Sequence, residues 1–392
     1  MAVQGRQLVP FAALSASYFA HIGFFNPYLP LWLKDLGYGL FVISVLSSVQ
    51  SATRLFAPYG WGWLSDHTGE RVKLLRYSAT VALAVSLALF MPLSPWALGL
   101  VLLLLFTHTS SMMPMSEAAL AHLVSAGGAF DARRYGRVRL WGSAGFLVTV
   151  LAAGAWFQAH GMGSFALWTV LSLAAVAASV WSLPDLKEAL PAHEARVSMA
   201  PVLAQPLVRW FFAAAFFHVL AHIAVYVFFS LYLDALGYSK TLIGLLWALS
   251  VVVEIGWFYT QARWLPRLSL SAWLVLCSVA MTLRMGLTAQ WAGVLGVLLL
   301  AQVLHALTFA AHHTSCIALL SHHFPGRLRA RGQALYTVLA YGVPGVVGGL
   351  LGGLLSQRFG LASVFWAAML AAAVASVCAL RVWRLQAAHA AG

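Results

Sequence analysis

The chain has 392 residues and few charges: 62% of its residues are apolar and only 8% are charged. Soluble domains contain about 25% charged residues, so this composition excludes an ordinary soluble enzyme and also a disordered chain. Three cysteines are too few for a disulfide scaffold. The net charge of +13 is spread over short clusters between apolar segments, which does not favour a nucleic-acid partner.

Apolar segments about 20 residues long recur along the whole chain, as membrane-crossing helices require. We therefore predict an all-α membrane protein with twelve transmembrane helices in two six-helix halves. The predicted helices, in chain order, are 8–33, 39–64, 74–92, 96–124, 136–159, 163–183, 207–234, 240–262, 269–288, 291–321, 332–357 and 361–383.

The basic residues between these helices fall mostly on one side of the membrane. With a cytoplasmic N-terminus, 18 Lys and Arg residues lie on the cytoplasmic side and 3 on the other, while Arg54 and Arg284 lie inside helices. Positive charge is concentrated in cytoplasmic loops, so both termini are expected in the cytoplasm. The proline-containing stretch 184–206 is expected to be a cytoplasmic linker between two six-helix bundles, 1–183 and 207–392.

The two halves resemble each other at an offset of 200 residues. Segments 28–38 and 228–238 align without gaps and share the pattern Leu-x-Leu-x-x-Leu-Gly-Tyr. Two related halves are typical of transporters that work by alternating access, with the substrate site where the repeats meet. At the same offset Arg54 aligns with Glu254, so opposite charges occupy corresponding positions.

The loop after the second predicted helix carries a recognisable motif. Residues 62–73 read Gly-Trp-Leu-Ser-Asp-His-Thr-Gly-Glu-Arg-Val-Lys, which resembles the G-x-L-x-D-x-x-G-x-R/K signature of the major facilitator superfamily. The resemblance implies that superfamily's twelve-helix transporter fold. In such a loop an aspartate can accept hydrogen bonds at a helix end, while basic side chains reach carboxylates or helix C-termini. The expected conformational latch comprises Gly62, Asp66, Gly69, Arg71 and Lys73.

Two further segments resemble the lactose permease and phenylpropionate permease groups of that superfamily. Residues 135–143 read Tyr-Gly-Arg-Val-Arg-Leu-Trp-Gly-Ser and resemble the block that begins helix five. Residues 114–118 read Pro-Met-Ser-Glu-Ala and resemble a block of helix four. The matching carboxylate and arginine of lactose permease hold the sugar, so the resemblance implies Glu117 and Arg139 as substrate-binding residues.

The second half is more similar to the phenylpropionate permease. The segments that carry this likeness include His222, 246–249, Glu254, Arg284 and 304–313. There is one departure from lactose permease, in which a carboxylate three residues after the helix-ten histidine carries the proton. The corresponding residue here is Thr308, so another group must carry a proton if transport is proton-coupled.

Four charged side chains lie inside the predicted helices, namely Arg54, Glu117, Glu254 and Arg284. Each costs about 2.5–3.5 kcal/mol at the centre of a helix on insertion scales, so we expect them to pair and to face a polar cavity. A carboxylate beside an arginine changes its proton affinity when the arginine turns away. Glu254 is therefore the first candidate for the proton carrier and Glu117 the second. A purely structural ion pair is the alternative.

Histidines and tryptophans supply the remaining candidates. His305 and His313 are expected to take part in proton coupling, because imidazole titrates near neutral pH, and His222 in substrate binding. Trp141 and Trp247 lie close in sequence to charged candidates and offer ring faces to a substrate. No metal site is expected, because adjacent histidines on a helix point about 100° apart.

The sequence contains no Walker motif and no hydrolase motif, so neither ATP drive nor enzymatic activity is expected, and the energy source is the proton gradient rather than a cofactor. We expect proton-coupled symport of a small aromatic organic acid such as 3-phenylpropionate, with Arg139 and either Arg54 or Arg284 at the carboxylate. A sugar or nucleoside proton symporter that uses Glu117 and Arg139 is the alternative, and drug or metabolite efflux is a third. The expected partners are the substrate, protons and the lipid of a bacterial inner membrane, with a monomeric chain.

Overall fold

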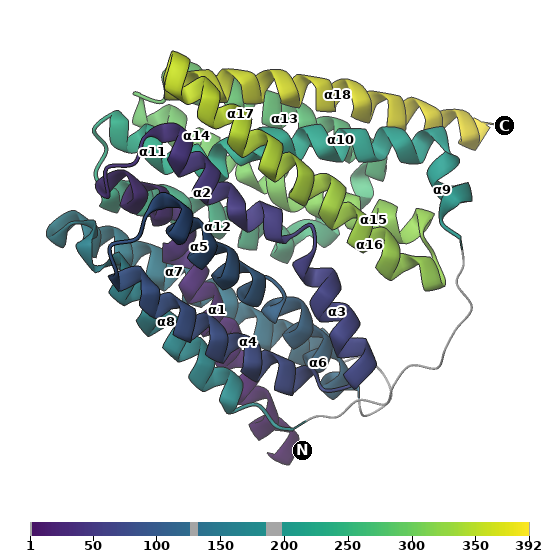
Figure 1. The fold of residues 1–392 in the computed structure, drawn as a ribbon. Helices are drawn as coiled ribbons and strands as arrows, with labels where there is room; N and C mark the ends of the chain where they lie inside the picture. The colour runs from purple at the N-terminus through teal and green to yellow at the C-terminus, as the bar shows by residue number, and fades with distance from the viewer. Residues whose placement is uncertain (1, 126–131, 186–197, 392) are drawn as a thin grey trace. The chain divides into compact units, whose positions relative to one another are not determined.

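The computed structural model describes residues 2–125, 132–185 and 198–391. Within these ranges the chain is helical and contains no strand (Figure 1). Twelve spans are long and apolar enough to cross a membrane, which confirms the predicted number. Residues 186–197 of the predicted linker lie outside the described residues.

Several spans consist of two helices in series. The helices of the first half are α1 (Ala2–Asp35), α2 (Leu40–Thr53), α3 (Ala57–Thr68), α4 (Arg71–Ser86), α5 (Pro95–Thr109), α6 (Met112–Ser125), α7 (Ala132–His160) and α8 (Phe165–Trp181). Those of the second half are α9 (Ala200–Ala204), α10 (Pro206–Ile223), α11 (Phe229–Ala235), α12 (Lys240–Trp264), α13 (Leu270–Trp291), α14 (Leu295–Val303), α15 (His312–His323), α16 (Arg329–Tyr336), α17 (Val343–Phe359) and α18 (Leu361–Ala391).

The chain divides into two compact units that nearly follow the two halves of the sequence. Unit 1 comprises Met1–Gly37, Thr53–His193 and Ser239–Leu245, and unit 2 comprises Tyr38–Ala52, Glu194–Tyr238 and Leu246–Gly392. Each unit thus takes in one short segment from the other half of the sequence. The two segments, which begin at Tyr38 and Ser239, follow the same turn of the internal repeat.

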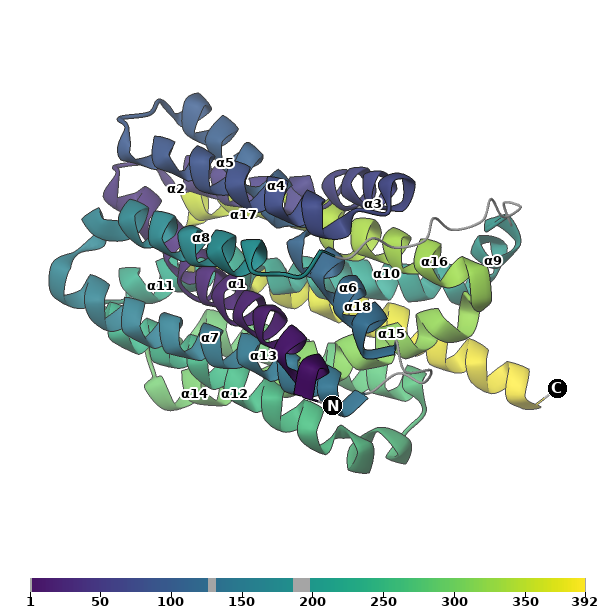
Figure 2. The ribbon, with the colours of Figure 1, turned by 90° about the horizontal axis from the view of Figure 1, so that it is seen from below.

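The helices of each unit pack in the same order. In unit 1, α1 packs against α7 and α8, and α4 packs against α5 and α8 (Figure 2). In unit 2, α10 packs against α17 and α18, and α13 packs against α15 and α18 (Figure 1). In each half the first span therefore packs against the fifth and sixth spans, and the third span packs against the fourth and sixth. The sequence repeat is thus a repeat of structure.

The turn that closes the first span of each half shows this repeat at atomic detail. Gly37 and Gly237 both have a φ of 85°, in the left-handed region that glycine enters without steric cost. The Gly37 amide donates to the Lys34 carbonyl at 2.9 Å, and the Gly237 amide donates to the Asp234 carbonyl at 3.0 Å. The shared Leu-Gly-Tyr sequence therefore encodes the same helix end twice.

Three spans of unit 2 widen into π-helix partway along their length. The π-helical segments are Ala224–Phe228 after α10, Ala306–Ala311 before α15 and Thr337–Gly342 before α17. Such widened turns often occur at functional sites. Among the described residues of unit 1 there is no π-helical segment. The polar cluster of unit 2, described below, lies on and beside these turns.

Helices α1 and α7 approach each other closely because small residues line their contact. A side chain at Gly145 would overlap the backbone of Ala16. Nearby, the Thr149 hydroxyl donates to the Ala20 carbonyl at 2.7 Å. Small residues allow this close approach between membrane helices, where packing and hydrogen bonds replace the hydrophobic drive.

We expect Gly145→Ala to lower the thermal unfolding midpoint of the purified protein, because overpacking costs about 1–3 kcal/mol. Gly256→Ala is the matched control, since that glycine also lies in a helix but a methyl group there would meet no atom within 4 Å. It should be neutral or slightly stabilising. Equal midpoints for the two variants, measured by fluorescence on heating in detergent, would show that the α1–α7 contact is looser than described.

Candidate functional site

The charged side chains predicted to lie inside helices fall into two clusters, one in each unit, and each cluster is described by itself. The Arg139 cluster of unit 1 comprises Tyr18, Phe19, Arg54, Glu117 and Arg139. The Arg284 cluster of unit 2 comprises Ser250, Glu254, Arg284, Gln302, His305 and Thr308. Together they contain all four charges predicted to lie inside helices.

In the Arg139 cluster, the two residues that the permease resemblance implies for substrate binding form an ion pair. Arg139 Nε lies 3.2 Å from Glu117 Oε1, and both side chains are partly exposed. The guanidinium also lies over the ring of Phe19, 4.3 Å from its centre, a favourable cation–π contact. The Arg139 cluster therefore offers a compensated charge pair beside an aromatic face.

Arg54 belongs to the same unit but lies in irregular backbone. It is the first residue of the three-residue turn that interrupts the second span between α2 and α3. Its side chain is half-buried. Both Arg54 and Glu117 lie within electrostatic reach of the buried Tyr18 hydroxyl.

The Arg284 cluster surrounds a guanidinium that is almost completely buried, with 1% of the residue exposed. Arg284 Nη1 donates to Thr308 Oγ1 at 2.9 Å and to His305 Nδ1 at 3.1 Å. Arg284 Nη2 donates to Gln302 Oε1 at 3.1 Å, and that oxygen also accepts from the Ser250 hydroxyl at 2.6 Å. Every one of these acceptors is neutral.

Arg284 thus corrects one expectation from the sequence, that the charges inside helices pair with each other. Among the described residues, no carboxylate oxygen lies within 4.0 Å of its guanidinium. Neutral acceptors satisfy the hydrogen bonds but leave the charge uncompensated, and a buried charge without a counter-ion is costly. The chemistry of the cluster is therefore that of a site that attracts an anion.

Glu254 approaches the cluster through His305 instead. Glu254 Oε2 lies 3.6 Å from His305 Nε2. Because Arg284 donates to His305 Nδ1, that nitrogen is unprotonated and the ring proton sits on Nε2, toward Glu254. A second proton on His305 would occupy Nδ1 and break its hydrogen bond with Arg284.

A small pocket beside the Arg284 cluster has room for about one water molecule. His222 stacks on Tyr226, with ring centres 4.6 Å apart, and lies edge-on to His305 at 5.5 Å. Its Nε2 is buried and has no hydrogen-bond partner. The pocket is lined by His218, Val219, His222, Tyr226, Thr308, Phe309, His312 and Tyr341.

The other predicted residues lie outside the two clusters. His313 stacks on Phe309 at 6.1 Å, and its buried Nδ1 has no partner. Trp247 is buried and its indole N–H donates to the Ser230 hydroxyl at 3.1 Å. Trp141 is 58% exposed on α7.

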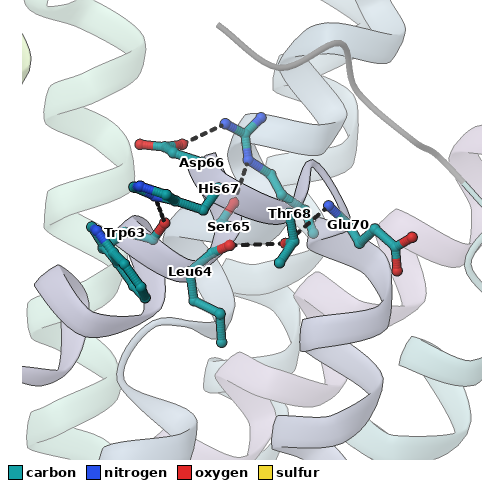
Figure 3. Close-up of polar contacts among 8 residues, drawn as sticks. Trp63, Leu64, Ser65, Asp66, His67, Thr68 and Glu70 are labelled. Carbon is teal, nitrogen blue, oxygen red and sulfur yellow. Dashed lines mark hydrogen bonds and ion pairs between the residues drawn. The ribbon is translucent and has the colours of Figure 1, made fainter. Parts of the chain in front are cut away.

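The predicted latch forms a compact set of contacts at the end of α3 (Figure 3). Gly69 ends the helix with a φ of 67°, and its amide donates to the Ser65 carbonyl. Arg71 Nε donates to Ser65 Oγ at 3.0 Å, and its Nη2 lies 3.4 Å from Asp66 Oδ1. Lys73 pairs with its neighbour Glu70. Gly62 lies one turn earlier in α3, with open space around its α-carbon.

Sequence reasoning missed Gln302 and Ser250. A sequence signal existed for Gln302, since it is the only amide in the apolar helix α14 and lies three residues before His305, a spacing that places two side chains on one helix face. Ser250 lies four residues before Glu254 on α12. No signal separates it from the other serines of the spans.

Twelve spans in two repeated units, with charged clusters held inside each, define a secondary transporter. The chain matches the MFS_1 like family model over residues 13–367 and belongs to this family of the major facilitator superfamily. It is 26% identical over 358 residues to a probable 3-phenylpropionic acid transporter from Escherichia coli, covering 91% of this chain and 93% of that protein. It is also 26% identical over 313 residues to a maltose permease from Geobacillus stearothermophilus, covering 78% and 76%.

Solved structures share the fold at much lower sequence identity. A mutant of the nucleoside transporter NupG matches with a TM-score of 0.83 at 15% identity, covering 96% of this chain and 99% of that one. A bacterial homologue of the lysosomal transporter Spinster, inward-facing and occupied, matches with a TM-score of 0.76 at 12% identity, covering 96% of each chain. These relatives and neighbours are all transporters.

We expect Arg284→Met to leave the thermal unfolding midpoint unchanged or to raise it, because the substitution removes a buried charge that has no counter-ion within 4.0 Å among the described residues and is therefore costly to bury. Arg139→Met should lower the midpoint slightly, by roughly 1 kcal/mol for a half-exposed pair, because it leaves Glu117 without its partner. A greater loss of stability in Arg284→Met would identify Arg284 as a structural anchor.

Proposed function

We propose that this transporter carries a small aromatic organic acid, similar to 3-phenylpropionate, together with a proton by alternating access. The observation that carries the proposal is the buried guanidinium of Arg284 with only neutral acceptors around it. A carboxylate substrate would supply the missing negative charge. The relative that is a probable 3-phenylpropionic acid transporter covers most of the chain and supports this substrate class.

Aromatic side chains near Arg284 favour a ring-bearing acid over a simple one. Tyr226, Phe309 and Tyr341 line the pocket beside the cluster. Ring faces and edges bind other aromatic rings in offset or edge-on geometry, and each pair contributes about 0.5–1.5 kcal/mol beyond burial of its area. We infer that the carboxylate turns toward Arg284 and the ring toward these residues.

The contacts of His305 provide a means of coupling the proton to the substrate. In the structure His305 Nδ1 accepts one of the Arg284 hydrogen bonds, and Nε2 faces Glu254. A proton that arrives on His305 Nδ1 removes the acceptor from Arg284, and the ring then passes its Nε2 proton to Glu254. The guanidinium then has a donor free for the carboxylate. Loss of the carboxylate restores the original bond and returns the proton. Glu254 is the proposed proton carrier.

Glu254→Gln tests this role. The variant should retain counterflow of labelled substrate, because exchange needs no net proton movement, and should lose uphill accumulation. Both are measured in proteoliposomes with an imposed pH gradient. Asp35→Asn, at the exposed end of α1, is the control and should accumulate substrate normally. Uphill accumulation by Glu254→Gln at the wild-type level would remove Glu254 from the proposal.

A specific observation also favours a second candidate, a proton symporter for a sugar or nucleoside. Glu117 and Arg139 form a polar pair beside the ring of Phe19, an arrangement able to hold hydroxyl groups and a sugar face. The maltose permease and NupG fit this alternative. In that case Arg284 would serve coupling alone. Efflux of a drug or metabolite by the same fold would reverse the direction of either reaction.

The two candidates differ in the charge that they move. One proton with one monoanion moves no net charge, so only the pH gradient drives uptake, at about 1.4 kcal/mol per pH unit. One proton with a neutral sugar moves one charge, and the membrane potential adds about 2.3 kcal/mol per 100 mV.

Proton uptake by de-energised cells that express the protein separates these candidates. Pulses of 3-phenylpropionate should make the medium alkaline, while maltose and a nucleoside should not. Cells with an empty vector and cells with Arg284→Met should show no alkalinisation, which excludes passive entry of the acid. Alkalinisation with a sugar or nucleoside alone would instead establish the second candidate.

We also propose how the chain is oriented and in which membrane it lies. The excess of Lys and Arg on one side of the spans supports cytoplasmic placement of both termini. The Escherichia coli relative supports a bacterial inner membrane as the location, and we propose a monomer as the working form. The latch residues Asp66 and Arg71 would then lie on the cytoplasmic side.

A further inference from the structure

Two buried histidines outside the Arg284 cluster lie face to face. His218 on α10 and His312 at the start of α15 are 1% and 3% exposed. Their ring centres are 3.6 Å apart and their planes differ by 3°. One imidazolium over a neutral ring is attractive, whereas two imidazolium ions at this distance repel strongly. The pair can therefore hold no more than one proton.

The hydrogen bonds of His218 fix which of its atoms is free to take that proton. His218 Nε2 lies 2.8 Å from the Thr308 backbone carbonyl, which can only accept, so Nε2 carries the hydrogen of the neutral ring. The remaining nitrogen, Nδ1, faces the Ser278 hydroxyl at 3.4 Å. A hydroxyl both donates and accepts, so it can serve either state of Nδ1.

His312 has weaker polar contacts. Its two ring nitrogens lie 3.8 and 3.7 Å from Cys316 Sγ, and a thiol is a weak donor and a weak acceptor. No strong hydrogen bond therefore holds His312 in one tautomer. This ring can receive a proton without first breaking a strong bond.

The pocket connects the stacked pair to the proposed coupling site. His218 and His312 both line it, and so does His222, whose buried Nε2 has no partner. His222 in turn lies edge-on to His305, with ring centres 5.5 Å apart. A buried nitrogen without a partner is normally satisfied by water, so the pocket is a polar step between His305 and the pair.

Thr308 joins the same two sites through its two oxygens. Its hydroxyl accepts from Arg284, and its carbonyl accepts from His218. Thr308 lies in the π-helical segment Ala306–Ala311, where the turn is wider than in an α-helix. A change in the position of the Arg284 guanidinium is therefore transmitted to the ring of His218 through one residue.

We propose that the stacked His218–His312 pair is a proton-relay site, which holds one proton and exchanges it with the His305–Glu254 contact through the pocket beside His222. The role in transport rests on the proposed proton coupling. The proton forms an N–H bond on Nδ1 of His218 or on a nitrogen of His312 as its bond to the donor in the pocket breaks. No bond between heavy atoms changes. His222 and a water in the pocket carry the proton to His305.

Several groups act on the charge of this pair. Arg284 disfavours a proton there while its own charge is uncompensated, so a substrate carboxylate beside Arg284 would favour one. Among the described residues, no titratable group of α17 or α18 contacts either ring. The titratable and charged groups that face the pair are Arg284 of α13, His222 of α10, and His313 and Cys316 of α15, with Cys277, Tyr226 and Tyr341 beyond them.

Solid-state ¹⁵N NMR of histidine-labelled protein in lipid bilayers tests the site directly. Because Arg284 disfavours a proton on the pair, the spectra extend below the usual range of histidine titration, from about pH 8 to about pH 4. One imidazolium signal should appear that is absent from both His218→Gln and His312→Gln. The double variant should lose no further imidazolium signal, because the pair holds a single proton. His160→Gln, an exposed ring at the end of α7, should lose a different signal. Two neutral rings throughout, or two imidazolium signals, would overturn the proposal.

Transport assays then separate a relay from a structural stack. His312→Gln should slow net proton-coupled uptake about tenfold or more and leave counterflow unchanged. Equal slowing of both, or of neither, would contradict a relay. Failure of the proposed coupling is distinguishable, because wild type would then show no uphill accumulation while the NMR result on the pair would be unaffected.

Discussion

The buried charge of Arg284 is the constraint on which the organisation of unit 2 depends. A guanidinium away from water needs acceptors on its donors and a negative charge nearby, and the protein supplies only the acceptors. Gln302, His305 and Thr308 reach it from one span, which places the amide, the imidazole and the hydroxyl on a single face.

In unit 1 the arginine of the cluster has a carboxylate partner. Glu117 and Arg139 compensate each other and remain partly exposed, so the cluster is complete without a ligand. The two units share one packing order yet differ in the charge that they hold. One half holds an ion pair beside an aromatic ring, and the other holds a guanidinium with neutral acceptors beside a histidine-lined pocket.

Much of this fold is predictable from sequence because membrane spans are encoded by long apolar runs and the repeat by a gapless motif. The repeated turns at Gly37 and Gly237 are one example. The sequence also identifies Glu117 and Arg139, because each lies in a short segment that resembles the permease groups. The partners of Arg284 were not, because hydrogen bonds to neutral side chains such as Gln302 leave no charge pattern in the sequence. The stacking of His218 on His312 depends on how two distant helices pack, which periodicity does not encode.

The three π-helical turns of unit 2 give that unit a mechanical property that unit 1 does not show in its described residues. A π turn holds about one residue more than an α turn, and it can move along a helix when one hydrogen bond is exchanged for the next. Each such step turns the side chains that it passes by about 100° and shifts them about 1.5 Å along the axis. Tyr226, Thr308 and Tyr341 all lie on these turns. Unit 2 can therefore change the side chains that it presents in discrete steps within a helix.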